Sequence, residues 1–210
     1  ARSLDLDILI DLAGLLFGNR IQALRVRCAP IQISWLGYCN TLGIKNMDYI
    51  IADPNLIKKE EEELYSEEIL YLPNIWNSMS KPKNLPNVNI LPAKNSSIFT
   101  FGSFNNIAKV NDRVVLVWSK ILSDLPNAKL ILQNSCFRHK QVCNKFLMAF
   151  AKHGINVTRI ELRDSAKTRA LHLNQYNDID IALDPFPYNG TTTTCEALWM
   201  GVPVIGILRD

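Results

Sequence analysis

The sequence has no long apolar run, although 48% of its 210 residues are hydrophobic. A membrane-spanning helix needs about 20 consecutive apolar residues, and no stretch reaches that length. The N-terminus also has no signal-peptide pattern, in which a charged segment precedes an apolar one. We therefore expect a globular protein of the cytoplasm that has no membrane partner.

A large excess of charge of either sign is absent as well. Lys and Arg number 23 against 20 for Asp and Glu, so the formal net charge is only +3, and the positive residues are scattered. A nucleic-acid-binding protein usually carries a basic patch or stripe. The five cysteines are odd in number and form no Cys-x-x-Cys motif, which is typical of reduced thiols. These absences predict no nucleic-acid partner and no disulfide framework.

A regular alternation of apolar strands and helices is present instead. Runs rich in Ile and Leu, bounded by Gly, Pro and Asn, predict strands at 5–12, 30–36 and 48–52. From residue 98 onward the predicted strands are 98–104, 128–133, 157–162, 179–183 and 203–208, and the predicted helices are 111–124, 137–152, 166–176 and 192–200. This order predicts an α/β fold with parallel strands and helices on both faces of the sheet.

Two stretches interrupt the alternation. Residues 58–68 are acidic and predict a solvated helix or loop, whereas residues 72–97 are rich in Pro, Asn, Lys and Ser, which is the composition of a linker. We place a domain boundary in this linker, with one domain at 1–90 and a second at 91–210. Because the sequence begins and ends close to predicted strands, we expect it to be part of a longer protein.

Two predicted strands begin with the spacing Asp-x-Asp, at Asp5/Asp7 and at Asp178/Asp180. This spacing can hold a divalent ion against a diphosphate. Ligands of parallel sheets gather beyond the carboxyl ends of the strands, however, and these pairs precede their strands. We interpret both pairs as solvated strand starts and predict no metal site.

The most informative segment follows the predicted strand at 179–183. Two prolines and Gly190 prevent regular structure, and a run of threonines then opens the next helix: Thr191, Thr192, Thr193 and Thr194. The first turn of a helix has unpaired N–H groups and a partial positive charge, so this segment is suited to holding a phosphate. The alternative is an ordinary helix start closed by a capping box between Thr193 and Glu196.

A second loop follows the predicted strand at 98–104 and contains Asn105, Asn106 and Lys109. Both loops follow parallel strands, so both can face one crevice, with Lys109 on one side of a pyrophosphate and the threonine loop on the other. His172, one helix earlier than the threonines, is placed to stack on a base. The alternatives are a surface lysine and a histidine that packs on its own helix.

Four motifs, taken together and in order, resemble the catalytic region of O-linked N-acetylglucosamine transferases and SPINDLY proteins. They are APIQISWLGY at 29–38, MDYIIAD at 47–53, FGSFNNIAK at 101–109 and YNGTTTTCE at 188–196. The resemblance covers nearly the whole chain. It implies a GT-B architecture, in which two Rossmann-like domains hold a nucleotide sugar in the cleft between them, usually after tetratricopeptide repeats. Residues 1–90 are then the end of the first domain, and 91–210 are most of the nucleotide-sugar-binding domain.

The resemblance also implies roles for individual residues. Lys109 matches the lysine on the donor diphosphate, Asn106 matches a polar neighbour, and His172 matches a histidine stacked on the base. Thr192 and Thr193 match phosphate-binding threonines, and Glu196 matches an acidic residue that binds ribose hydroxyls. The same motifs contribute the other expected donor-binding residues: Asn105, Asn189, Gly190, Thr191 and Thr194.

Some positions depart from the family pattern. Thr191 stands where the animal enzymes have a histidine, whereas SPINDLY proteins have a similar run of threonines. Many bacterial relatives carry a histidine directly after the glycine that matches Gly14, and some members have one where this chain has Asn74. No histidine or carboxylate here is a convincing base for an acceptor hydroxyl.

The implied reaction is an inverting, metal-independent transfer of N-acetylglucosamine from UDP-N-acetylglucosamine to Ser and Thr hydroxyls of proteins. Its partners are therefore a nucleotide sugar and protein acceptors, and it needs no cofactor. One alternative is a SPINDLY-like O-fucosyltransferase that uses GDP-fucose, because the threonine run resembles SPINDLY. Another is a non-catalytic nucleotide-binding or interaction module, because the two histidines are missing.

Overall fold

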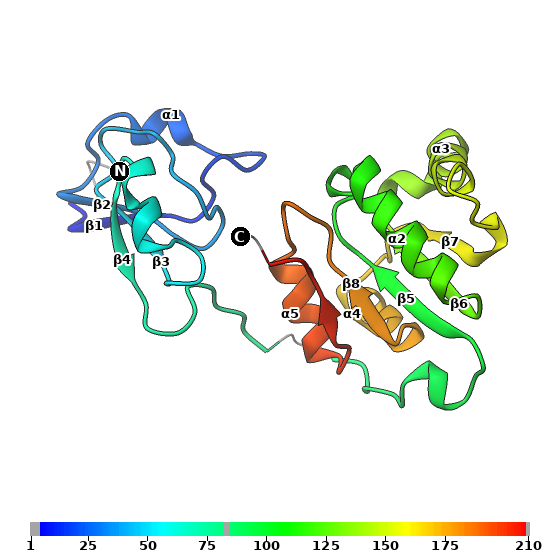
Figure 1. Cartoon of the computed structure of the whole chain (residues 1–210). Helices are drawn as coiled ribbons and strands as arrows, with labels where there is room; N and C mark the ends of the chain where they lie inside the picture. The colour runs from blue at the N-terminus through cyan, green and yellow to red at the C-terminus, as the bar shows by residue number, and fades with distance from the viewer. Residues whose placement is uncertain (1–4, 82–84, 209–210) are drawn as a thin grey trace. The chain divides into compact units, whose positions relative to one another are not determined.

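The computed structural model describes residues 5–81 and 85–208. The chain divides between residues 80 and 81 into two compact units, and each unit contains its own parallel sheet (Figure 1). The division falls within the linker-like stretch at 72–97, of which residues 82–84 lie outside the described residues. The predicted α/β class with parallel sheets is confirmed.

The first unit contains a four-stranded sheet whose strands lie in sequence order. Its elements are β1 (Ile8–Asp11), α1 (Ile21–Leu24), β2 (Ile31–Ser34), β3 (Tyr49–Ala52) and β4 (Glu68–Tyr71), with a 3-10 turn at Lys59–Leu64. The sequence did not predict β4, because its first residue, Glu68, was assigned to the acidic stretch at 58–68. That stretch is also less solvated than predicted at one end. Glu67 is buried and accepts hydrogen bonds from Thr41 Oγ1 at 2.6 Å and from the backbone N–H of Leu42 at 2.8 Å.

One face of this sheet is packed, and the other is partly open, although Ile33 on it is buried. Leu9 packs with α1 and the loops near Leu42 and Met47, and Ile50 on the same face packs with Ile57. On the opposite face, the side chains of three isoleucines are more than a third exposed: Ile8, Ile10 and Ile31. The register pairs Ile8 with Ile31, so these side chains are neighbours.

The second unit is a five-stranded sheet with the order β7-β6-β5-β8-β9. Its strands are β5 (Phe99–Ser103), β6 (Ala128–Gln133), β7 (Ile160–Arg163), β8 (Ile181–Leu183) and β9 (Val204–Ile205). Its helices are α2 (Asp112–Asp124), α3 (Lys140–Ala151), α4 (Arg169–Asn174) and α5 (Thr192–Trp199). Short 3-10 turns lie at Pro92–Lys94, Ile107–Lys109, Ser135–Arg138, Val157–Arg159 and Gln175–Asp178.

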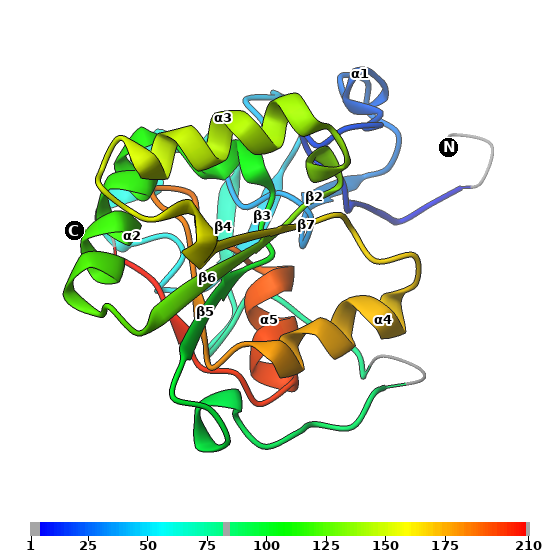
Figure 2. The same ribbon diagram turned by 90° about the vertical axis from the view of Figure 1, so that its right-hand side faces the viewer.

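Helices cover both faces of this second sheet (Figure 2). Leu130 and Leu132 of β6 pack against Trp118 of α2 and Phe150 of α3. Ile131 points to the other face, where it belongs to a cluster that includes Ala197 of α5. Successive side chains of a strand alternate between faces, so an almost continuous apolar run is what a strand buried on both sides requires. Every strand and helix predicted from residue 98 onward is present, with ends shifted by a few residues.

The prediction of solvated strand starts is wrong for one of its four aspartates. Asp180 is buried, and its carboxylate accepts hydrogen bonds from the backbone N–H groups of Ala93 and Thr100, both at 2.8 Å. A carboxylate that accepts two amide hydrogen bonds can be buried at the start of β8, where it ties β8 to β5. Asp5 and Asp7 are exposed as expected, and Asp178 forms a half-exposed ion pair with Arg163.

Candidate functional site

The two predicted loops follow neighbouring strands. β5 pairs in parallel with β8, with Phe101 opposite Ile181 and Gly102 opposite Ala182. The loop at 104–111 and the loop at 184–191 therefore leave the sheet at the same edge, beyond its carboxyl ends. In open α/β sheets this edge is where ligands bind.

Direct hydrogen bonds join the two loops. Lys109 Nζ donates to the backbone carbonyl of Asn189 at 2.8 Å, and the ammonium lies 4.5 Å from the centre of the Tyr188 ring. Thr193 Oγ1 donates to Oδ1 of Asn105 at 3.0 Å. The lysine and the threonine loop thus belong to one connected structure.

The helix start at α5 does not form the capping box that was the alternative interpretation. Thr191 is the N-cap, and its side chain makes no capping hydrogen bond. The Thr193 hydroxyl is engaged with Asn105, and Glu196 contacts other side chains, so neither closes the box. Thr194 Oγ1 donates back to the carbonyl of Gly190 at 3.0 Å. Thr191 and Thr192 are exposed, which leaves the first turn of α5 open to a ligand.

Gly190 is required by the close approach of the loops. A Cβ atom at this position would lie 2.4 Å from Thr193 Oγ1, 2.7 Å from Asn105 Oδ1 and 2.9 Å from Asp184 Oδ1. Any side chain would push these groups apart. Asn106 has a local role in the same loop, because its Oδ1 accepts the backbone N–H of Ala108 at 3.1 Å and closes the turn that carries Lys109.

His172 and Glu196 contact each other at the side of this site. Glu196 is buried, with Oε2 3.1 Å from His172 Nε2 and Oε1 3.2 Å from Arg169 Nη2. The His172 ring lies 5.9 Å from Phe104 and 5.7 Å from Tyr176, centre to centre. The imidazole is therefore oriented by a carboxylate and two aromatic rings.

Tyr176 connects this cluster to the threonine loop. Its hydroxyl donates to the backbone carbonyl of Thr193 at 3.2 Å. Burial, with a smaller contribution from the Glu196 carboxylate, raises the pKa of Tyr176 far above its ordinary value. The phenol therefore stays protonated and remains a hydrogen-bond donor.

Sequence reasoning missed two residues that organise the site. Arg169 pairs with Glu196, and Asp184 accepts hydrogen bonds from both loops: from Asn105 Nδ2 at 3.2 Å, from Asn189 Nδ2 at 2.9 Å and from the Gly190 backbone N–H at 2.8 Å. Asp184 had a usable signal, because it is an acidic residue directly after a buried strand. Arg169 had none, since an arginine in the first turn of a short helix is ordinarily exposed.

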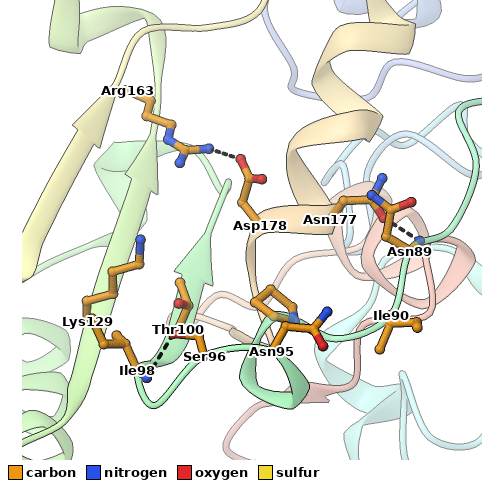
Figure 3. A pocket seen from close by; sticks show the side chains of 11 residues that line it. Asn89, Ile90, Asn95, Ser96, Ile98, Thr100, Lys129, Arg163, Asn177 and Asp178 are labelled. Atoms are coloured by element: carbon orange, nitrogen blue, oxygen red, sulfur yellow. Dashed lines mark hydrogen bonds and ion pairs between the residues drawn. The ribbon is translucent and has the colours of Figure 1, made fainter.

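The second unit also contains a polar groove of about 660 Å³ that is separate from this site (Figure 3). Lys129 and Arg163 supply its positive charge. Both are already paired: Lys129 lies 3.5 Å from Glu161, and Arg163 contacts Glu161 and Asp178. An anion in this groove would have to compete with those carboxylates.

The described residues contain neither a metal-ligand cluster nor a membrane-spanning helix. Among residues 5–81 and 85–208, no group of three or more His, Cys, Asp and Glu side chains is arranged to hold a metal ion. Within the same residues, no helix has the length and apolar character needed to cross a membrane.

The fold and the site define a class of protein. A parallel sheet whose neighbouring carboxyl-end loops join a lysine to an open helix start is the arrangement of Rossmann-like α/β units, a class in which this edge is the usual place for a ligand. Comparison with known proteins identifies the family. The profile described as glycosyl transferase family 41 matches residues 3–89 and 90–210, and the chain belongs to that family.

Similar proteins agree with this assignment. The chain is 38% identical over 95% of its length to "Probable UDP-N-acetylglucosamine--peptide N-acetylglucosaminyltransferase SPINDLY" of Oryza sativa subsp. japonica. A mutant of the Thermobaculum terrenum O-GlcNAc transferase is 36% identical, with a TM-score of 0.93 over 99% of this chain and 39% of that chain. The pneumococcal O-GlcNAc transferase GtfA shares the fold only, because its sequence identity is 13%. Its TM-score is 0.55, over 96% of this chain and 42% of the GtfA chain. The chain spans 22% of the Oryza relative.

Proposed function

We propose that the protein containing this chain transfers N-acetylglucosamine from UDP-N-acetylglucosamine to Ser and Thr hydroxyls of proteins, with inversion and without a metal ion. Membership of glycosyl transferase family 41 supports the reaction class. The observation that carries the proposal is the pair of contacts between the two loops, Lys109 to Asn189 and Asn105 to Thr193. They gather the groups that can hold a diphosphate into one place.

The physical demand of the reaction is the negative charge that develops on the leaving diphosphate. The acceptor oxygen forms a bond to the anomeric carbon, the bond from that carbon to the diphosphate oxygen breaks, and the hydroxyl proton is released. Donors fixed in advance stabilise the leaving group more than the ground state, which lowers the barrier. Lys109 and the N–H groups at the start of α5 supply this stabilisation in our proposal.

One contact of Lys109 favours this role. Its ammonium donates to a neutral carbonyl, that of Asn189. A charged phosphate oxygen is a stronger acceptor than a neutral carbonyl, so a bound diphosphate can replace this contact.

His172 and Glu196 are proposed to contact the nucleoside. The ring of His172 has fixed neighbours, Phe104 and Tyr176, which orient it for stacking on a base. A carboxylate accepts about four hydrogen bonds, so Glu196 retains acceptor capacity for a ribose hydroxyl while it contacts Arg169 and His172.

The test is turnover by the full-length protein and its Lys109→Ala variant. We expect Lys109→Ala to lower the rate about a hundredfold, equivalent to about 3 kcal/mol of transition-state stabilisation, with folding unchanged. Lys129→Ala, in the separate groove, is the matched control and should keep wild-type turnover. Wild-type turnover by Lys109→Ala would contradict the proposal, and loss of activity on adding a chelator would contradict metal independence.

A second candidate is transfer of fucose from GDP-fucose. The threonine run, and Thr191 in particular, favours it, because SPINDLY proteins resemble this chain there. Calorimetric titration of the full-length protein with UDP and with GDP separates the two, and we expect tighter binding of UDP. Tighter binding of GDP supports the fucose donor, and binding of neither nucleotide, together with no donor hydrolysis, supports a non-catalytic module.

A further inference from the structure

Asp184 is a buried carboxylate at the centre of the site that the proposed chemistry does not use. It directly follows β8, and its relative exposure is 7%. Its Oδ1 accepts from the Gly190 backbone N–H at 2.8 Å and from Asn105 Nδ2 at 3.2 Å, while Oδ2 accepts from Asn189 Nδ2 at 2.9 Å. Both loops of the site are therefore attached to one side chain.

Each attachment leads to a group that we propose contacts the diphosphate. Asn105 donates to Asp184 through Nδ2 and accepts the Thr193 hydroxyl through Oδ1. Asn189 donates to Asp184 through its side chain and accepts Lys109 Nζ through its backbone carbonyl. Asp184 thus lies two hydrogen bonds from the threonine hydroxyl and two from the lysine ammonium.

We propose that Asp184 is the positioning residue of the donor-diphosphate site: it sets the distance between Lys109 and the threonine loop through Asn189, Gly190 and Asn105. This inference rests on the proposed function, since the diphosphate is the ligand whose binding it controls. Asp184 does not touch the diphosphate in this arrangement, and its effect is transmitted by its three neighbours.

The chemistry of the position calls for a carboxylate. Three N–H donors converge on it, and only an ionised carboxylate offers two oxygens that both accept. An asparagine offers one oxygen and one N–H group, so at least one of the three donors loses its acceptor or must turn away. A negative charge so near an anion site is tolerated because it is hydrogen-bonded to these donors.

The experiment compares Asp184→Asn with Asp180→Asn in the full-length protein. Asp180 is the matched control, because it is also a buried carboxylate next to β8 that accepts backbone N–H groups, from Ala93 and Thr100 at the other end of the strand. Two quantities are measured: the Kd for UDP and for GDP by calorimetry, and amide hydrogen exchange at 185–194 relative to the core strand β6.

For Asp184→Asn we expect a Kd at least about tenfold higher for whichever nucleotide the wild type binds, as loss of a charged hydrogen bond implies. Exchange at 185–194 should accelerate at least about tenfold relative to β6. Asp180→Asn should change neither the nucleotide Kd nor the exchange at 185–194 relative to β6 by more than about twofold. Equal effects of the two variants, or unchanged exchange at 185–194 in Asp184→Asn, would overturn the positioning role.

The exchange measurement keeps this inference separate from the proposed function. If the wild type binds neither UDP nor GDP, the proposed function is wrong, and loop exchange alone decides whether Asp184 positions the loops. If Asp184→Asn does not fold, Asn189→Ala replaces it, since this exposed residue loses one bond to Asp184 and keeps its backbone carbonyl. Faster exchange at 185–194 in that variant supports the inference, and unchanged exchange overturns it.

Discussion

Asp48 makes a pH-dependent contribution to the stability of the first unit. A single substitution can measure this contribution. It forms an ion pair with Arg27, with Nη2 2.9 Å from Oδ1, and it accepts the backbone N–H of Gln32 at 2.8 Å. The hydrogen bond from the Arg27 guanidinium lowers the pKa of the Asp48 carboxyl below its usual value. The ionised form is therefore stabilised by folding.

The sign of the pH dependence follows from this shift. A carboxyl with a depressed pKa in the folded state stabilises the protein fully above its unfolded pKa, about 3.9, and loses that contribution as the pH falls through the folded pKa. We expect Asp48→Asn to lower the unfolding temperature at pH 6 and to have a smaller effect at pH 3. Thermal melts of both proteins from pH 3 to 6 measure the difference, and a constant difference across that range would contradict it.

Residues of the candidate site could be predicted from the sequence where both the residue type and its position after a strand pointed to a ligand. Lys109 and Thr193 follow neighbouring parallel strands, so their proximity could be expected from the sequence alone. The partners they have were not predictable, because a backbone carbonyl such as that of Asn189 has no sequence signal. Asp180 was misread for a related reason: an aspartate before a strand is equally compatible with solvent and with two backbone amides.

At the scale of elements, the tight loops at the carboxyl ends of strands depend on glycines. Gly190 is one case in the second unit. In the first unit, a Cβ at Gly37 would lie 1.9 Å from the carbonyl oxygen of Leu12, so the loops after β1 and β2 approach each other equally closely.

Gly190→Ala tests this requirement at the site. Its Cβ would collide with groups from both loops, so we expect nucleotide affinity to fall about tenfold, while stability falls by about 1–3 kcal/mol as in other overpacked positions. Gly154→Ala is the control, because Gly154 has a φ of +79° and no atom within 4 Å of the added Cβ. It should lower stability by a similar amount, about 1 kcal/mol, and leave nucleotide affinity unchanged. A Gly190→Ala protein that binds nucleotide normally would show that the loops can separate without loss.

The elements themselves were largely predictable from hydrophobic periodicity, and the exceptions are short. α2 has caps and a clear apolar face, and Asn111 caps it by accepting the N–H groups of Arg113 and Val114. β4 was missed because it begins at Glu68, within the acidic stretch that predicts a solvated helix or loop. The 3-10 turn of Lys109 depends on Asn106, whose capping role is visible only once the loop is folded.

At the scale of the whole chain, the two units differ in how completely their sheets are covered. The second unit has a packed cluster on each face of its sheet. The first unit leaves Ile8, Ile10 and Ile31 exposed on one face. Parallel sheets in α/β proteins are normally covered on both faces, so these isoleucines mark the less completely covered sheet of the two.

All candidate donor-binding residues lie in the second unit, and this predicts an unequal response to nucleotide. A ligand that binds only the folded state stabilises it by about 2.7 kcal/mol at a hundred times its Kd. UDP at that concentration should slow exchange of the most protected β6 amides by about a hundredfold, because those amides exchange when the second unit unfolds. Amides of β3, in the first unit, should be unaffected.

Hydrogen exchange of the intact protein with and without UDP measures the β3 and β6 amides together. Lys109→Ala, which we expect to bind the diphosphate less tightly, should show less slowing of β6 exchange at the same UDP concentration. Equal slowing of β3 and β6 would contradict this expected difference, because it would show that the nucleotide stabilises both units together.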